Sequence, residues 1–213
     1  MSARWLVLLG ILALPVCAQA QTRTLAVYSD GVPSLDAATS ESLTQELQRV
    51  LAPAGLEVAM RSKSQRTGDE FQLLVVGAFD GNCSVDRLPV AHAISLRAGP
   101  LADTSISGGH VLPFFRVDCN RVIETLAPAL QPLTEPMRNA FLGRALARVI
   151  AHEIYHIVAQ TIDHQESGIA KAALSVKDLT SLQFDLNAAS LHRMHPLNAP
   201  VVPRGTLAVV TSR

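Results

Sequence analysis

Residues 151–164 read AHEIYHIVAQTIDH and hold four side chains that can bind or serve a metal ion: His152, Glu153, His156 and His164. On a helix, side chains four positions apart lie one above the other on the same face. We therefore expect His152 and His156 to direct two imidazoles to one point. That is the geometry that a zinc ion requires of two of its ligands.

Glu153 occupies the position after the first of these histidines, about 100° round the helix from it. A carboxylate there is well placed to take a proton from a water molecule held on the metal. A single histidine on a half-apolar helix is usually an ordinary core or surface residue. Two at this spacing with glutamate between them form the HExxH motif, which has a mechanism and seldom arises by chance.

The composition describes an ordinary globular chain. The 213 residues suggest one domain with a substantial core. Lysine and arginine together number 18, as do aspartate and glutamate, so the charge gives no indication of a nucleic-acid partner. Hydrophobic residues make up 48% of the chain, which argues against disorder. No run after residue 20 is apolar and long enough to span a bilayer.

Residues 1–20 have the parts of a secretory signal peptide. A positively charged start is followed by an apolar run at 5–16, too short for a membrane span, and by an Ala-Gln-Ala cleavage site that ends at Ala20. We expect a mature chain that begins at Gln21 and is secreted or periplasmic. The alternative is a lipoprotein acylated at Cys17.

Cys83 and Cys119 remain after removal of this segment. An even pair in an exported chain predicts a disulfide, which would stabilise the fold by roughly 3–4 kcal/mol in the chain-entropy model. The alternative is two buried free thiols. Neither cysteine has a neighbour at metal-ligand spacing, so we expect no zinc–thiolate site.

The pattern of apolar and turn residues predicts an α+β domain with a sheet of about four to five strands. The expected strands are short and β-rich, and cover 24–30, 56–62, 71–79, 88–99 and 110–119. The third is apolar enough to be central in the sheet. Pro113 argues that the last strand lies at an edge or contains a bulge. An edge strand beside a cleft can pair with an extended peptide.

Helical spacing predicts an amphipathic helix at 34–51, and we expect a short helix or a turn at 120–130. The longest helix is expected at 136–158, after the start signal Thr134-Glu135-Pro136, and it carries the histidine pair. We interpret residues 100–109 as a loop. A last helix is expected at 176–192, where Ser175 and Asp178 form a plausible cap.

The sequence HEIYH with a following histidine resembles the zincin metallopeptidases and is most similar to the metzincins, of a bacterial secreted type. The resemblance implies a single domain at 21–213. Its sheet would pack on an N-terminal helix and a long active-site helix within 21–158, and a small, mostly helical subdomain would occupy 159–213. It also implies that His152 and His156 bind Zn²⁺ and that Glu153 is the general base.

The third ligand differs from the metzincin pattern, in which a third histidine follows the second by six positions with a glycine between them. Here that position is Ile162, and no glycine lies between His156 and His164. In a continuous helix His164 would lie about 12 Å along the axis from His156, too far to share a metal. The helix must therefore break within 160–163 for His164 to be the third ligand, which is the arrangement we favour.

Other third ligands stay open. A thermolysin-like site needs a later glutamate on a second helix, and the only one after His156 is Glu166, which is too close for that arrangement. An aspartate-type site could use Asp163, Asp178 or Asp185.

The resemblance implies a zinc metallopeptidase that cleaves peptides or proteins. A water on zinc would attack the carbonyl, with Glu153 as the base. The alternative is a secreted zinc-binding or interaction domain without hydrolytic activity. A fourth ligand from the protein would close the site and make it structural, whereas an open position favours the enzyme. A third possibility is an exported interaction domain in which the histidines bind no metal.

Overall fold

The structure is a computed structural model that describes residues 22–29, 35–62, 71–86, 88–89 and 99–195. The expected signal peptide lies outside these residues. So does most of the strand expected at 88–99, and the residues of that stretch that are described form no strand.

Within the described residues, five strands form one mixed sheet in the order β2-β1-β3-β5-β4. They are β1 (Arg23–Ser29), β2 (Leu56–Ser62), β3 (Leu73–Asp80), β4 (Ala102–Ser107) and β5 (His110–Asp118). All neighbouring pairs are parallel except β4 and β5, which are antiparallel. The mixed sheet agrees with the expected α+β class, and β3 is the central strand, as its apolar sequence predicted.

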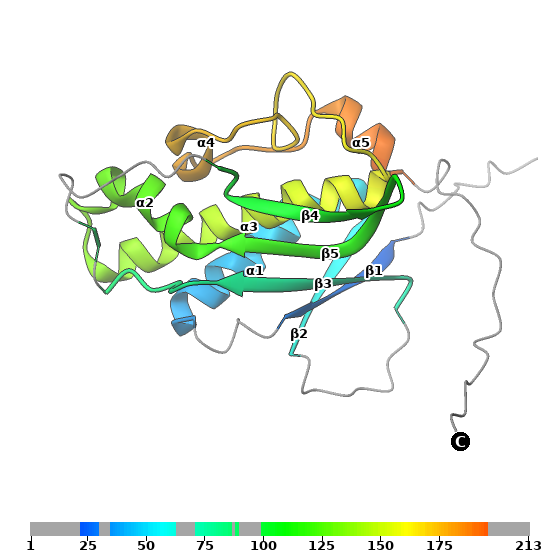
Figure 1. Cartoon of the computed structure of the whole chain (residues 1–213). Coiled ribbons are helices and arrows are strands. Elements are labelled where there is room, and N and C mark those ends of the chain that lie inside the picture. The colour runs from blue at the N-terminus through cyan, green and yellow to red at the C-terminus, as the bar shows by residue number, and fades with distance from the viewer. Residues whose placement is uncertain (1–21, 30–34, 63–70, 87, 90–98, 196–213) are drawn as a thin grey trace, which may run out of the picture.

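Helices α1 (Ala37–Leu51) and α3 (Glu135–Ala159) pack side by side on one face of the sheet (Figure 1). The turn η2 (Ala52–Ala54) ends α1, and α2 (Cys119–Leu130) follows β5 directly. Beyond α3 the chain runs back along the β4 side of that helix and contains the short helices α4 (Val176–Thr180) and α5 (Ala188–Met194). Each helix up to α3 lies within three residues of its expected bounds.

The core fills the space between the sheet and the two long helices. Alternate strand residues face the helices, as the two-residue repeat of a strand requires. The fully or almost fully buried residues of this layer include Leu25, Val27, Val75, Phe115 and Val117 from the sheet and Leu43, Leu47, Leu146 and Ile150 from the helices. The part of α3 that precedes the histidines is therefore packed firmly on the sheet.

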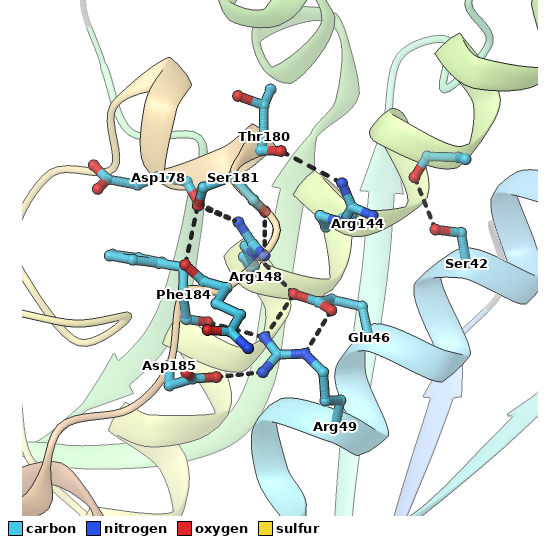
Figure 2. A network of polar contacts seen from close by, with 12 residues as sticks. Ser42, Glu46, Arg49, Arg144, Arg148, Asp178, Thr180, Ser181, Phe184 and Asp185 are labelled. Atoms are coloured by element: carbon cyan, nitrogen blue, oxygen red, sulfur yellow. Dashed lines mark hydrogen bonds and ion pairs between the residues drawn. The ribbon is translucent and has the colours of Figure 1, made fainter.

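A buried ion pair joins the two long helices. The Arg148 side chain has no exposed surface, and its Nε donates to Glu46 Oε1 at 2.7 Å (Figure 2). Arg49 also donates to Glu46, at 2.8 and 2.9 Å. Burial raises the pKa of Glu46, but the hydrogen bonds from Arg49 and Arg148 outweigh it and hold that pKa below its usual value. Glu46 is therefore the charged partner of two guanidinium groups.

The prediction of a loop at 100–109 is wrong, because most of this stretch forms strand β4. Gly108 and Gly109 have φ of 56° and 80°, which fits a two-residue hairpin turn that needs left-handed backbone at both positions. The 110–119 strand was expected to lie at an edge of the sheet or to contain a bulge, and the second alternative applies, because β5 lies between β3 and β4. The β4–β5 register shifts between the pairs Thr104–Phe115 and Ile106–Val111, and Pro113 lies within that interval on β5.

The single helix expected at 176–192 is wrong as well. The capping box of Ser175 and Asp178 is present and starts α4, but the helix ends at Thr180, and the next residue, Ser181, has ψ of 156°. Arg148 Nη1 and Nη2 donate to the carbonyls of Asp178 and Ser181 at 2.5 and 2.8 Å. These bonds hold the chain in a bend, and Asn187 starts α5 as a new cap.

Cys83 and Cys119 lie at disulfide distance, as expected, with Cα atoms 4.9 Å apart. This pair joins the chain after β3 to the first residue of α2. Among the described residues, no helix has the length and apolar character needed to cross a membrane.

The contact of α1 with α3 at Gly143 gives a test of the packing. A Cβ there would lie 2.4 Å from the carbonyl oxygen of Thr39 and 2.9 Å from the backbone nitrogen of Leu43. Alanine would favour the helix by about 1 kcal/mol, but separating two packed helices costs about 1–3 kcal/mol. We expect Gly143→Ala to lower the free energy of unfolding in urea; an unchanged or higher value would contradict this packing.

Candidate metal centre

The helix α3 ends one turn after His156, within the stretch where a break was required. Gln160 has φ of 48°, in the left-handed region that residues other than glycine seldom adopt. Its side-chain amide donates to the carbonyls of Ile157 at 2.7 Å and Val111 at 3.3 Å. These bonds to α3 and β5 fix the turn although no glycine is present.

The turn brings His164 back to the other two histidines. His152, His156 and His164 each offer a ring nitrogen, and these three atoms lie within 4.8 Å of one another. The His164 ring centroid is 5.2 Å from that of His152 and 4.9 Å from that of His156. The three side chains singled out in the sequence therefore converge on one point.

Backbone carbonyls orient two of the rings. His152 Nδ1 lies 2.7 Å from the carbonyl oxygen of Ile169, and His156 Nδ1 lies 2.8 Å from that of Thr161. Because a carbonyl oxygen only accepts, each Nδ1 carries the hydrogen, and in a neutral ring the Nε2 is then a bare lone pair.

The two bare nitrogens face each other at 3.0 Å. Neither can donate to the other when both rings are neutral, so a cation between them is the natural partner. Two ligands of a tetrahedral zinc ion with bonds of 2.0–2.1 Å lie about 3.3 Å apart. The donor set and its spacing fit such an ion.

The surroundings keep these rings neutral. Burial lowers the pKa of His152 to about 4, with a further lowering from His156 and His164, although the bond to Ile169 opposes the shift. Burial also lowers the pKa of His156. Both imidazoles are thus unprotonated at neutral pH, which is the form that binds metals.

Glu153 is buried beside this cluster but is not part of it. Its Oε2 accepts a hydrogen bond of 2.5 Å from the hydroxyl of Thr104, on β4. Burial raises the pKa of Glu153 to about 7; the Thr104 bond opposes this shift and the charge of Asp103 adds to it. A carboxyl with a pKa near neutrality is suited to take up and release a proton.

A pocket of about 510 Å³ opens over the histidines and Glu153. One wall is β4, an edge strand of the sheet, and another is the segment at 171–174. Apart from the site residues, the lining is mostly apolar and includes Leu101, Val149 and Leu174. The cluster therefore lies at the surface of a cavity large enough for part of a ligand.

The acidic alternatives for the third ligand are placed elsewhere. Asp178 caps α4 and pairs with Lys171, and Asp185 pairs with Arg49. Asp163 is exposed and lies 3.3 Å from Arg193, and Glu166 is exposed. Within the described ranges, the group of side chains at metal-binding spacing contains the three histidines and no carboxylate.

Sequence reasoning missed Thr104 and the carbonyl of Ile169. Thr104 fell in the stretch interpreted as a loop, although Gly108-Gly109 between β-branched residues is a hairpin signal that predicts a strand there. The Ile169 carbonyl has no signal in the sequence, because any residue supplies the same group.

Comparison with models of known protein families found none that matches this chain, and comparison with curated protein sequences found no similar protein. The function is therefore argued from the geometry of the site.

The left-handed turn can be tested with two substitutions at one position. Gln160→Gly and Gln160→Ala both remove the side-chain amide, but only alanine keeps a Cβ in the left-handed conformation. We expect the glycine variant to be more stable than the alanine variant by about 1 kcal/mol in thermal or urea unfolding. Equal stability of the two variants would show that α3 does not end in this turn.

The raised pKa of Glu153 predicts a pH effect on the metal-free protein. The folded state holds its proton up to about pH 7, whereas the unfolded state releases it near 4.5. The protonated Glu153 carboxyl therefore contributes its full share of the free energy of unfolding below pH 4.5, and this contribution is lost as the pH rises to about 7. Relative to Glu153→Gln, the wild type should lose free energy of unfolding across this window in a chelating buffer. Parallel pH profiles of the two proteins would contradict the shift.

Proposed function

We propose that this chain is a zinc-dependent hydrolase of peptide bonds, exported by its N-terminal signal. The observation that carries the proposal is the pair of bare Nε2 atoms of His152 and His156, 3.0 Å apart beside a third histidine and a buried glutamate. This arrangement has the donors of a metal site and a separate proton acceptor, as the resemblance to zincins implies.

The three histidines would hold the zinc. Protein ligands number three in catalytic zinc sites, where a fourth position stays open, and four in structural sites. In the described part of the chain the cluster offers three donors and borders a pocket, which favours the enzyme over the structural site. Zinc bound there would lower the pKa of a water ligand and polarise a substrate carbonyl.

Glu153 would act as the general base. Glu153 lines the pocket and its carboxylate accepts from Thr104, which would hold it beside the space where water and substrate would meet. Taking the proton from the attacking water and passing it to the leaving amine requires a pKa near the working pH. The carboxyl's burial provides that pKa.

The shape of the site favours an extended peptide as substrate. The strand β4 lies at the end of the sheet order and forms a wall of the pocket. Its outer edge can pair with a peptide backbone, the role that the sequence suggested for the strand at 110–119. The apolar lining around Val149 and Leu174 suits an apolar side chain, and we expect peptides with such residues to be cleaved best.

The main prediction concerns metal and activity together. The mature chain from Gln21 should bind one zinc per molecule and cleave unstructured protein substrates. Glu153→Gln should keep the zinc while kcat falls roughly 100- to 10,000-fold, since general-base catalysis contributes about that much. His156→Ala and His164→Ala should lose both zinc and activity. Elemental analysis and a fluorogenic peptide assay measure these outcomes.

His110→Ala is the matched control, because this exposed histidine on β5 lies outside the cluster. It should keep zinc and activity. Zinc without hydrolysis of any peptide would favour the binding domain, whereas no zinc in the wild type after metal is added back would contradict the proposal.

A further inference from the structure

The carbonyl that orients His152 belongs to a tight turn after α3. Ile169 is fully buried, and Gly168 before it has φ of 75°, in the left-handed region. Across the turn, the backbone nitrogen of Lys171 donates to the carbonyl of Gly168 at 3.2 Å, and that of Gln165 donates to Ala170 at 2.8 Å. The Ile169 carbonyl can therefore move only if the whole turn moves.

The turn rests on a second segment, just before α5. The backbone nitrogen of Ile169 donates to the carbonyl of Asp185 at 3.0 Å, and Asn187 Nδ2 donates to the carbonyl of Ser167 at 3.0 Å. The contact is close: a Cβ on Gly168 would lie 2.6 Å from the Asp185 carbonyl oxygen. A shift of Asp185 would therefore move Ile169 and its bond to His152.

Two arginines hold this second segment to the long helices (Figure 2). Arg49 pairs with the carboxylate of Asp185 and donates to the carbonyl of Phe184 at 3.1 Å. Arg148 donates to the carbonyl of Ser181 at 2.8 Å. Both guanidinium groups are fixed in turn by the buried carboxylate of Glu46. Their planar forks hold several donors in a fixed geometry, whereas the ammonium group of a lysine is a single rotatable point charge.

We infer that Arg49, Glu46 and Arg148, which we call the arginine clamp, position the metal ligand His152. The clamp fixes Asp185, Asp185 fixes Ile169, and the Ile169 carbonyl fixes the tautomer and direction of the His152 ring. None of the three clamp residues belongs to the histidine cluster. The inference rests on the proposed function for its metal, but the orientation of His152 is a property of the metal-free protein.

The long helix α3 carries both the ligand His152 and a member of the arginine clamp. Arg148 lies one turn before His152 on α3, so the helix that carries the ligand also holds the segment that orients it. Ligand and orienting carbonyl therefore share one rigid support. Groups that orient a metal-binding histidine typically change metal affinity about 10- to 100-fold when removed.

Two variants test the clamp at different points. Arg49→Gln removes the link to Asp185 and leaves the buried Glu46–Arg148 pair in place, so it should fold. Gly168→Ala pushes the turn away from Asp185 at the other end of the relay. Each should raise the zinc dissociation constant about 10-fold or more in competition with a chromophoric chelator, and each should change the visible spectrum of bound Co²⁺.

Each variant has a matched control. Arg138→Gln also removes an arginine that binds backbone carbonyls, those of Leu130 and Gln131, at the far end of α3. Gly109→Ala places a Cβ at φ of 80° with no atom within 4 Å of it. Both controls should keep the zinc dissociation constant within about two-fold of the wild-type value, which separates positioning from a general loss of stability.

A second readout does not need the metal. Nitrogen-15 NMR of the metal-free wild type should show His152 with its hydrogen on Nδ1, and both test variants should show a mixture of tautomers. A wild type that binds no zinc would contradict the proposed function. The clamp would still be tested, because the His152 tautomer is measured in the metal-free protein. Unchanged tautomers and affinity in folded Arg49→Gln, or equal effects in Arg138→Gln, would overturn the inference.

Discussion

The left-handed turn at Gln160 is the constraint on which the site depends. A continuous α3 would carry His164 about 12 Å along the axis from His156, too far for the two to bind one metal ion. The turn ends the helix, frees the Thr161 carbonyl to accept from His156, and reverses the chain so that His164 faces the pair. A left-handed conformation costs a residue with a Cβ about 1–2 kcal/mol. The hydrogen bonds from the Gln160 side-chain amide to α3 and β5 offset part of this cost.

Beyond that turn, side chains from the long helices bind the backbone of the chain. The segment 160–194 contains only two short helices, so most of its backbone groups have no ladder or helix to bind them. Arginines on α1 and α3 supply donors for the carbonyls of Asp178, Ser181 and Phe184, and Glu46 balances their charge. A buried charge network is costly to break once formed, which makes it a rigid base for a site that needs exact ring directions.

Much of the fold could be predicted because its signals are local. The helical spacing of the apolar residues and the HExxH motif located α3 and two histidines, and β2 has the bounds expected from its β-rich sequence. One failure was local, since Gly108-Gly109 signalled the hairpin that the loop expected at 100–109 missed. The others involve residues far apart in the sequence. The helix expected at 176–192 is interrupted by Arg148, about 30 residues earlier in the chain, and Thr104 is 49 residues from the Glu153 that it contacts. Such contacts depend on tertiary packing and leave no periodicity in the sequence.

Anomalous diffraction at the zinc edge, from crystals of the zinc-loaded mature chain, tests the central claim most directly. The account predicts one strong peak with the Nε2 atoms of His152 and His156 and a ring nitrogen of His164 at about 2.0–2.1 Å, and with the Glu153 carboxylate outside the coordination sphere. A peak bound by Asp163 or Glu166 in place of His164, or the absence of a peak between the histidines, would contradict it.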